Sequence, residues 1–273
     1  MKRLGLLAGV GNLPVEFMRA AQKQGYAVVV ISLLKGTAPE LKEEADVYYE
    51  INVAKLDKVI KTLVKEQALE VTMIGKVTKE VLFQGLNFPD MRALKLLNRL
   101  RNREDDTIML AIVEELAKDG ITVADQTSFL QAIMPEEGIL SKRKPTKEEW
   151  EDIEFGFHIA KEMGALDIGQ TVVVKHKAVM AIEAIEGTDA CILRGGKLGR
   201  GNSVVVKVAK PNQDVRFDVP AVGKKTIESM IESGCSVLAM EAKRTLFVEQ
   251  EAVLKLAAKH NICICAVRKE GQI

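Results

Sequence analysis

The sequence LGLLAGVGNLPVEFMRAAQKQ, residues 4–24, decides the fold of the first half of the chain. Its apolar start predicts a strand, its two later glycines predict a tight turn, and its amphipathic end predicts a helix. The first N–H groups of such a helix can bind an anion. The turn is therefore either a cradle for a nucleotide phosphate or only a tight connection. The candidate contacts to a phosphate are Gly9, Gly11, Asn12 and Leu13.

The same turn lacks two features of the dinucleotide-binding fingerprint, which has a third glycine and an acidic residue about 20 residues further on. Pro14 stands at the position of the third glycine, and the second apolar run, 27–33, ends without an acid. An oxidoreductase that uses NAD or FAD remains an alternative interpretation of the glycine turn. The missing third glycine and the missing acidic residue argue against it.

Strand and helix signals continue to alternate, with strands expected over 47–51 and 71–74 and a helix over 56–66. This alternation predicts a parallel, Rossmann-like sheet with helices on its faces, which binds ligands at the carboxyl ends of its strands. Lys76 and Thr78 follow the strand at 71–74 and are candidates for contacts to phosphate or uracil. The alternative is a solvated loop.

Two further helices are expected in the first half. The run 91–100 carries leucines at helical spacing, and a second helix begins near Asp105 and Asp106. Acidic residues at a helix start are stabilised by the helix dipole, but paired aspartates are also good ligands for hard metals. Asp105 and Asp106 are therefore substrate-binding candidates beside the capping interpretation. The leucines are Leu94, Leu97 and Leu100.

Residues 134–149, MPEEGILSKRKPTKEE, interrupt the hydrophobic periodicity with proline, glycine and charge. Such a segment is typical of a connection between domains. The sequence therefore predicts an α/β protein of two domains: a Rossmann-like α/β domain over 1–133, a linker over 134–149 and a mixed α/β catalytic domain over 150–273.

The composition argues against several classes of protein. A net charge of +1 and 4% aromatic residues offer little to nucleic acid, so no nucleic-acid partner is expected. No apolar run approaches the roughly eighteen residues of a membrane span, and the N-terminus does not have the pattern of a signal peptide, so we expect a cytoplasmic protein. The four cysteines lack C-x-x-C spacing and are expected to be buried, reduced thiols.

In the second half, β-branched runs at 171–175 and 178–183 predict a hairpin. A glycine-broken turn with carboxylates and a hydroxyl follows it, and this pattern indicates either a functional site or the capped start of a helix. The polar residues concerned are Glu186, Thr188, Asp189 and Arg194.

The densest chemistry lies in KPNQDVRFD, residues 210–218. If residues 214–218 are extended, Asp214, Arg216 and Asp218 share one face of a strand, and the two carboxylates lie about 13 Å apart. That separation is too large for one shared metal ion. Either the chain bends before the proline at position 220 or the two aspartates have different roles.

Carboxylates can hold Mg²⁺ or position a water, and guanidinium or ammonium groups neutralise phosphate oxygens. The chain has three histidines and none is spaced as a metal pair, so zinc is not expected. The segment therefore predicts Mg²⁺-assisted phosphate chemistry, and an exposed strand face with ion pairs is the alternative. The residues with a candidate role are Lys210, Gln213, Asp214, Arg216 and Asp218.

Six motifs occur in order over nearly the whole chain: AGVGNLP (8–14), GKVTKE (75–80), DDTIML (105–110), DIGQTVVV (167–174), EAIEGTDACILR (183–194) and KPNQDVRFDVPAVGKKT (210–226). Together they closely resemble the LpxI family of UDP-2,3-diacylglucosamine pyrophosphatases. The last two motifs are long and specific.

The resemblance implies hydrolysis of UDP-2,3-diacylglucosamine to 2,3-diacylglucosamine 1-phosphate and UMP, a cytoplasmic step of lipid A assembly. It also implies dependence on Mg²⁺, attack of water on the α-phosphorus, and a site between two domains. Gln170 of the DIGQ motif becomes a substrate-binding candidate. The resemblance leaves open which carboxylate binds metal and which positions water. The catalytic candidates are Glu186, Asp189, Asp214 and Asp218, and the metal ligands are sought among the three aspartates.

Two rivals remain beside this interpretation: the nucleotide-dependent oxidoreductase, and a sensor that binds UDP-sugar without turnover. Because the implied substrate is a lipid, transient contact with the inner membrane surface is expected, although the sequence shows no evident amphipathic anchor. A homodimer is the default expectation for a cytoplasmic enzyme.

Overall fold

The computed structural model describes residues 2–77, 88–100 and 105–268 of the 273 residues. The chain divides into two compact units, each described here by itself. Unit 1 consists of Met1–Leu130 together with Val215–Phe217, and unit 2 of Gln131–Asp214 and Asp218–Ile273. The candidate Thr78 lies outside the described residues.

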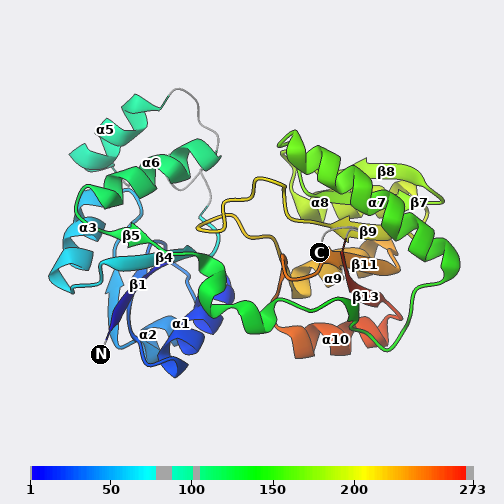
Figure 1. Cartoon of the computed structure of the whole chain (residues 1–273), viewed down its shortest axis with the longest axis horizontal. Helices are drawn as coiled ribbons and strands as arrows, with labels where there is room; N and C mark the ends of the chain where they lie inside the picture. The colour runs from blue at the N-terminus through cyan, green and yellow to red at the C-terminus, as the bar shows by residue number, and fades with distance from the viewer. Residues whose placement is uncertain (1, 78–87, 101–104, 269–273) are drawn as a thin grey trace. The chain divides into compact units, whose positions relative to one another are not determined.

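Unit 1 is built on a five-stranded sheet in the order β3-β2-β1-β4-β5, with every neighbouring pair parallel (Figure 1). The parallel sheet predicted from the alternation of strands and helices is confirmed. Because the strand order reverses direction at β1, the carboxyl ends of β1 and β4 flank the place where open sheets bind ligands. The strands are β1 (Arg3–Ala8), β2 (Ala27–Ser32), β3 (Val47–Glu50), β4 (Glu70–Ile74) and β5 (Thr122–Val123).

The helices of unit 1 bury one apolar side against this sheet. On α5 the buried side chains are Ala93 and Leu96, whereas Leu94 is exposed. The side chain of Asp90 caps α5 by accepting a hydrogen bond from Ala93 N at 2.9 Å, which fixes where the helix begins. The helices are α1 (Leu13–Lys23), α2 (Glu40–Glu44), α3 (Leu56–Lys65), α5 (Met91–Arg99) and α6 (Asp105–Ala117), with a short turn of 3-10 helix at η1 (Gln126–Phe129). A second such turn, η2 (Gln131–Ile133), begins unit 2.

Unit 2 contains a six-stranded mixed sheet in the order β6-β13-β11-β9-β7-β8. Strands β9, β11 and β13 run parallel, whereas β7 is antiparallel to both β8 and β9. The predicted hairpin is confirmed: its turn is His176-Lys177, and both N–H groups donate to the buried carboxylate of Asp152. The strands are β6 (Gly138–Ile139), β7 (Thr171–Lys175), β8 (Ala178–Ile182), β9 (Val204–Lys207), β11 (Val237–Glu241) and β13 (Cys263–Val267), and β10 (Ala221–Val222) pairs separately with β12 (Leu246–Phe247).

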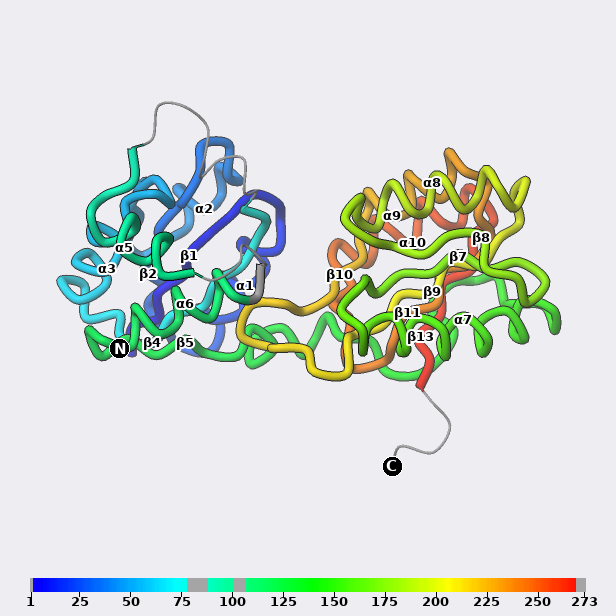
Figure 2. Tube along the Cα trace, turned by 90° about the horizontal axis from the view of Figure 1, so that it is seen from above, coloured from blue at the N-terminus to red at the C-terminus, as the bar shows by residue number. Residues whose placement is uncertain are grey.

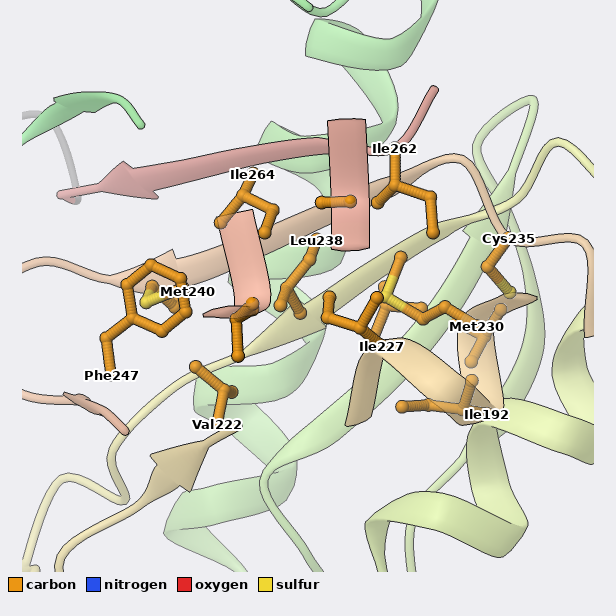
Figure 3. Close-up of a cluster of buried hydrophobic side chains, with 14 of the residues drawn as sticks. Ile192, Val222, Ile227, Met230, Cys235, Leu238, Met240, Phe247, Ile262 and Ile264 are labelled. Atoms are coloured by element: carbon orange, nitrogen blue, oxygen red, sulfur yellow. The ribbon is translucent and has the colours of Figure 1, made fainter. Parts of the chain in front are cut away.

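Helices cover both faces of the second sheet (Figure 2). Helix α7 packs on one face, and α8, α9 and α10 enclose the other around a core of aliphatic and sulfur-containing side chains (Figure 3). All four cysteines are buried and unpaired, as predicted. The bounds are α7 (Lys147–Ala165), α8 (Thr188–Leu198), α9 (Lys224–Ser233) and α10 (Gln250–Lys259).

The segment 134–149, expected as a linker, carries structure of its own. It contains β6, whose neighbour Leu140 donates through its backbone N–H to Ile264 O at 2.9 Å, and it contains the capped start of α7. Over the described residues, no helix is both long and apolar enough to cross a membrane.

Candidate functional site

The glycine turn after β1 packs against the loop after β4. Gly9 N donates to Ile74 O at 2.8 Å, and Val10 and Lys76 exchange two backbone hydrogen bonds of 3.0 Å. A Cβ atom on Gly9 would stand 2.6 Å from Lys76 O, and Gly75 has a φ of +98° with its own Cβ position 2.8 Å from the backbone of Gly9. Glycine is needed at both positions because the two loops touch through their backbones.

The start of α1 offers few groups to a dinucleotide. The backbone oxygen of Asn12 accepts from Val15 N and Glu16 N, and Pro14 has no N–H to give. Strand β2 ends at Ser32, which is buried and bonded to Leu34 O at 2.9 Å, so no carboxylate stands where a ribose would need one. The structure therefore adds no support to the oxidoreductase interpretation.

The remaining candidates of unit 1 follow the carboxyl ends of β1 and β4 or lie at the start of a helix. Lys76 is exposed, and Leu13 is the first residue of α1. Gly11 has a φ of +112° with open space around its Cβ position. Asp105 and Asp106 begin α6, and only their place in the helix is described.

An apolar cavity of about 270 Å³ opens among the strands and helices of unit 1. Leu7 of β1 and Met73 of β4 form part of its floor, and Ala93 and Leu96 of α5 form part of its wall. Phe217 also lines it, because Val215–Phe217 belongs to unit 1, where Val215 O accepts from Gln126 N at 3.0 Å. The tip of the segment that carries the catalytic candidates thus contributes to an apolar site.

Residues 214–218 form a turn, so the extended strand considered above is wrong for this segment. Asp218 N donates to Asp214 O at 2.9 Å, which closes a single turn of the i to i+4 type. The turn brings the backbones of Asp214 and Asp218 into hydrogen-bonding contact, whereas a straight strand would hold the two residues roughly 13 Å apart. The chain bends before Pro220, and the bend brings the two aspartates close together.

Lys210 and Gln213 hold this turn from its N-terminal side. The Lys210 ammonium lies 2.6 Å from Asp167 and 3.5 Å from Asp218. The side-chain amide of Gln213 donates to the Asp218 carboxylate, and its oxygen accepts from Lys210 N at 2.6 Å. The guanidinium of Arg216 lies 5.8 Å from the ring centroid of Phe217. The half-buried Asp218 is therefore oriented by a cation and an amide.

A second polar cluster lies at the carboxyl end of β9. Lys207 is 6% exposed and donates to Thr188 Oγ1 and to Ala221 O, both at 3.0 Å. The Thr188 hydroxyl in turn donates to Glu183 Oε1 at 2.9 Å, and Glu183 is 8% exposed. A buried ammonium and a buried carboxylate are thus joined through one hydroxyl group, an arrangement hereafter called the relay.

Two buried acceptor atoms border the relay without a hydrogen-bond partner among the described residues. They are Oε2 of Glu183 and Oε1 of Gln170. The two residues are neighbours across the hairpin, since Glu183 N donates to Thr171 O at 2.9 Å. Buried polar atoms normally have a partner, so these two acceptors lack a donor among the described residues.

The EGTD motif begins helix α8, but its side chains do not cap that helix. Gly187 is the N-cap with a φ of +79°, and it makes no side-chain cap hydrogen bond. Glu186 instead pairs with Arg194, and the hydrogen bond that the Arg194 guanidinium donates to the Glu186 carboxylate lowers the pKa of Glu186. The same guanidinium donates to Ile182 O at 2.9 Å. Asp189 pairs with Lys225 at 2.9 Å, which raises the pKa of Lys225.

Three buried charged residues stand outside the list of candidates drawn from the sequence. Lys207 and Glu183 belong to the relay, and Glu241, at the end of β11, accepts from Lys161 at 2.9 and 3.0 Å and from Ala209 N at 2.8 Å. The sequence signal that could have identified these residues is a charged residue at the end of an apolar, strand-like run. Among the described residues, no group of three or more His, Cys, Asp or Glu side chains could hold a metal ion, so Asp189, Asp214 and Asp218 do not form such a group here.

Known family models and a curated relative match this chain over most of its length. The model of the LpxI N-terminal domain matches residues 3–133, and that of the LpxI C-terminal domain matches residues 136–265. The chain belongs to the LpxI family. A relative from Caulobacter vibrioides, named UDP-2,3-diacylglucosamine pyrophosphatase LpxI, is 33% identical over 268 residues, which cover 94% of each chain.

A solved structure of glycinamide-RNase-transformylase T from Mycobacterium tuberculosis is also similar in part to this LpxI-family chain. The identity is 12%, the match covers 67% of this chain and 44% of that one, and the TM-score is 0.26. So low a score carries no argument about fold or function.

Proposed function

We propose that this chain hydrolyses the pyrophosphate bond of UDP-2,3-diacylglucosamine and releases UMP and 2,3-diacylglucosamine 1-phosphate, a reaction of lipid A biosynthesis. The Caulobacter relative is named for this activity. The observation that carries the proposal is the turn between Asp214 and Asp218, because it joins the backbones of two aspartates, and the Lys210 ammonium lies 3.5 Å from the carboxylate of the second. Carboxylates that position water and a cation that neutralises phosphate oxygens are the groups that hydrolysis of a pyrophosphate requires.

In the proposed reaction a water oxygen forms a bond to the α-phosphorus while the bond from that phosphorus to the bridging oxygen breaks. UMP gains the water oxygen, and the sugar keeps its own phosphate. We assign the positioning of the water and the acceptance of its proton to the pair Asp214 and Asp218. Charge that grows on the phosphate oxygens is neutralised by Lys210, Arg216 and Arg194.

Mg²⁺ suits the oxygen donors of this pair. Mg²⁺ is usually held by one or two carboxylates together with waters and substrate phosphates, rather than by a complete protein cage. Asp214 and Asp218 would supply the protein ligands, with Asp189 as a further candidate once Lys225 is displaced. When bound, the metal would neutralise charge on the pyrophosphate.

The apolar cavity of unit 1 suits a fatty acyl chain. Its walls are almost entirely aliphatic and aromatic, with Leu7, Met73, Leu96 and Phe217 among them. Apolar surface of this kind binds acyl chains because it removes them from water. Glu186 remains a catalytic candidate beside the aspartates. The candidates that remain for the uridine, phosphate and sugar groups are Gly9, Gly11, Asn12, Leu13, Lys76, Thr78, Asp105, Asp106, Gln170, Thr188 and Gln213.

A lipid-linked nucleotide sugar places the reaction at the cytoplasmic surface of the inner membrane, which the protein would contact transiently. The test is release of UMP from UDP-2,3-diacylglucosamine in detergent micelles, measured with Mg²⁺ and with EDTA. The proposal predicts release that depends on the metal. A protein that binds UDP-sugar without releasing UMP would be the sensor, and one that NAD but not UMP stabilises against heat would be the oxidoreductase.

A further inference from the structure

Helix α5 of unit 1, together with Phe88 just before it, exposes apolar side chains that do not line the cavity. Phe88 is 80% exposed, Met91 68% and Leu94 39%. The inner face of the same helix carries Ala93 and Leu96, which line the cavity. A surface helix normally presents polar residues to water, so an outer face of this kind indicates a partner.

Hydrogen bonds to residues 54–57 fix the backbone next to the exposed side chains. The Lys55 ammonium donates to Phe88 O at 2.8 Å, and Asp90 N donates to Ala54 O at 3.0 Å. The Asp90 carboxylate also accepts from Asp57 N at 2.8 Å and caps α5. These hydrogen bonds hold the start of α5 and the residues just before it to α3 and to the segment that precedes α3.

The charge on α5 is of one sign. The helix contains Arg92, Lys95 and Arg99 and no acidic residue. Arg92 is engaged with Glu115 and Asp119, whereas Lys95 and Arg99 are exposed and have no ion-pair partner among the described residues. Apolar side chains flanked by cations match the surface of a bilayer that contains anionic lipid.

We propose that the patch formed by Phe88, Met91 and Leu94, with Lys95 and Arg99 beside it, docks on an anionic phospholipid surface. The inference rests on the proposed lipid substrate, because docking through the outer face of α5 brings the cavity on its inner face to the bilayer. A second copy of the chain fits less well, since a two-fold contact through α5 would face its cations with cations. No homodimer is inferred from this face.

The test compares binding to two kinds of vesicle, one of phosphatidylcholine and one of equal parts phosphatidylcholine and phosphatidylglycerol, by sedimentation. The wild-type chain should bind the anionic vesicles more tightly and lose affinity as salt is raised. Phe88→Ser and Met91→Ser should each weaken binding about tenfold, as expected for the loss of one buried apolar side chain. Lys95→Glu should weaken binding several-fold on anionic vesicles only.

Leu198→Ser is the matched control, since Leu198 is 60% exposed but lies on α8 of unit 2, away from this patch. It should bind like the wild type. The docking proposal is overturned if the wild-type chain does not bind either vesicle, or if Phe88→Ser/Met91→Ser binds as tightly as the control. It is also overturned if light scattering shows a dimer that the double variant dissociates.

Failure of this proposal can be told apart from failure of the proposed function. With substrate dispersed in detergent, Phe88→Ser/Met91→Ser should release UMP within about twofold of the wild-type rate, because neither side chain lines the cavity. With substrate in anionic vesicles its rate should fall as its binding falls. Vesicle binding without any release of UMP in detergent would refute the function and leave the docking surface standing.

Discussion

Replacing Lys207 by Met tests whether the relay is a single buried charge network. The substitution keeps the length and the apolar stem of the side chain but removes the ammonium that donates to Thr188 Oγ1 and Ala221 O, both at 3.0 Å. Glu183 is then left buried with its compensating cation gone. Removing one partner of a buried ion pair costs about 3–5 kcal/mol, and the hydroxyl between the two groups here favours the lower end, about 3 kcal/mol.

A second substitution separates the electrostatic part of this destabilisation from the part due to lost packing. Glu183→Gln removes the negative charge, so in the Lys207→Met background it should cost much less than it does alone. We expect a coupling of about 1–3 kcal/mol between the two positions. Lys225→Met is the control: its ammonium also pairs with a carboxylate, that of Asp189 at 2.9 Å, but it is exposed, and its loss should cost below about 1 kcal/mol.

The assay is urea unfolding followed by tryptophan fluorescence. The chain has one tryptophan, Trp150, and it lies on α7, so the signal reports on unit 2. Lys207→Met should lower the midpoint of unfolding without a change in slope. Additive costs for Lys207→Met and Glu183→Gln, or a cost for Lys207→Met no larger than that of the control, would refute the reasoning.

Further predictions concern the catalytic turn, the start of α7 and the glycine loops. Asp218→Asn should lower the turnover of UMP release by about 10²–10⁴ with little change in melting temperature, and a near-normal rate would exclude Asp218 from catalysis. Burial alone would raise the pKa of Glu149, but the Arg143 guanidinium at 2.6 Å and the N–H of the N-cap outweigh it, and the pKa lies below the ordinary 4.5. Because the stabilisation by Glu149 is present above pH 4.5 and lost as pH falls through the lowered pKa, Glu149→Gln should melt below the wild type at pH 7, and this difference should vanish in acid. Gly75→Ala should destabilise unit 1 by about 1–2 kcal/mol or more in calorimetry, because its φ of +98° and the contact with Gly9 both exclude a Cβ atom; an unchanged transition would contradict this.

Much of the fold could be predicted because it follows from local pattern. Buried apolar runs at 4–8, 27–33 and 71–74 alternate with amphipathic helices, and that alternation has few solutions other than a parallel sheet. The hairpin with its turn at His176 followed in the same way from two β-branched runs. These features depend on residues close together in the sequence.

The catalytic segment could not be predicted in the same way, because its shape depends on distant residues. The turn at 214–218 has its tip in unit 1, where Val215 O accepts from Gln126 N, and no local pattern contains that contact. Lys207 and Glu183 lie 24 residues apart in sequence and meet only through Thr188. Their burial is a property of the folded sheet edge.

The apolar pattern of α5 shows a further limit. Leucines at helical spacing predicted the helix but not its buried side: Leu94 is exposed, and the buried residues are Ala93 and Leu96. The amphipathic surface that the sequence did not reveal became visible only when the structure assigned each face of the helix. Hydrophobic periodicity shows how apolar residues are spaced along a helix, but it does not show which other element packs against them.

Hydrolysis of UDP-2,3-diacylglucosamine in ¹⁸O-labelled water, with Mg²⁺ and with EDTA, tests both the proposed reaction and the atom that water attacks. We expect release of UMP that requires the metal and carries the label in the UMP phosphate. Label in the lipid phosphate would move the attacked atom to the other phosphorus. No release of UMP from well-folded protein, with Mg²⁺ present, would contradict the account.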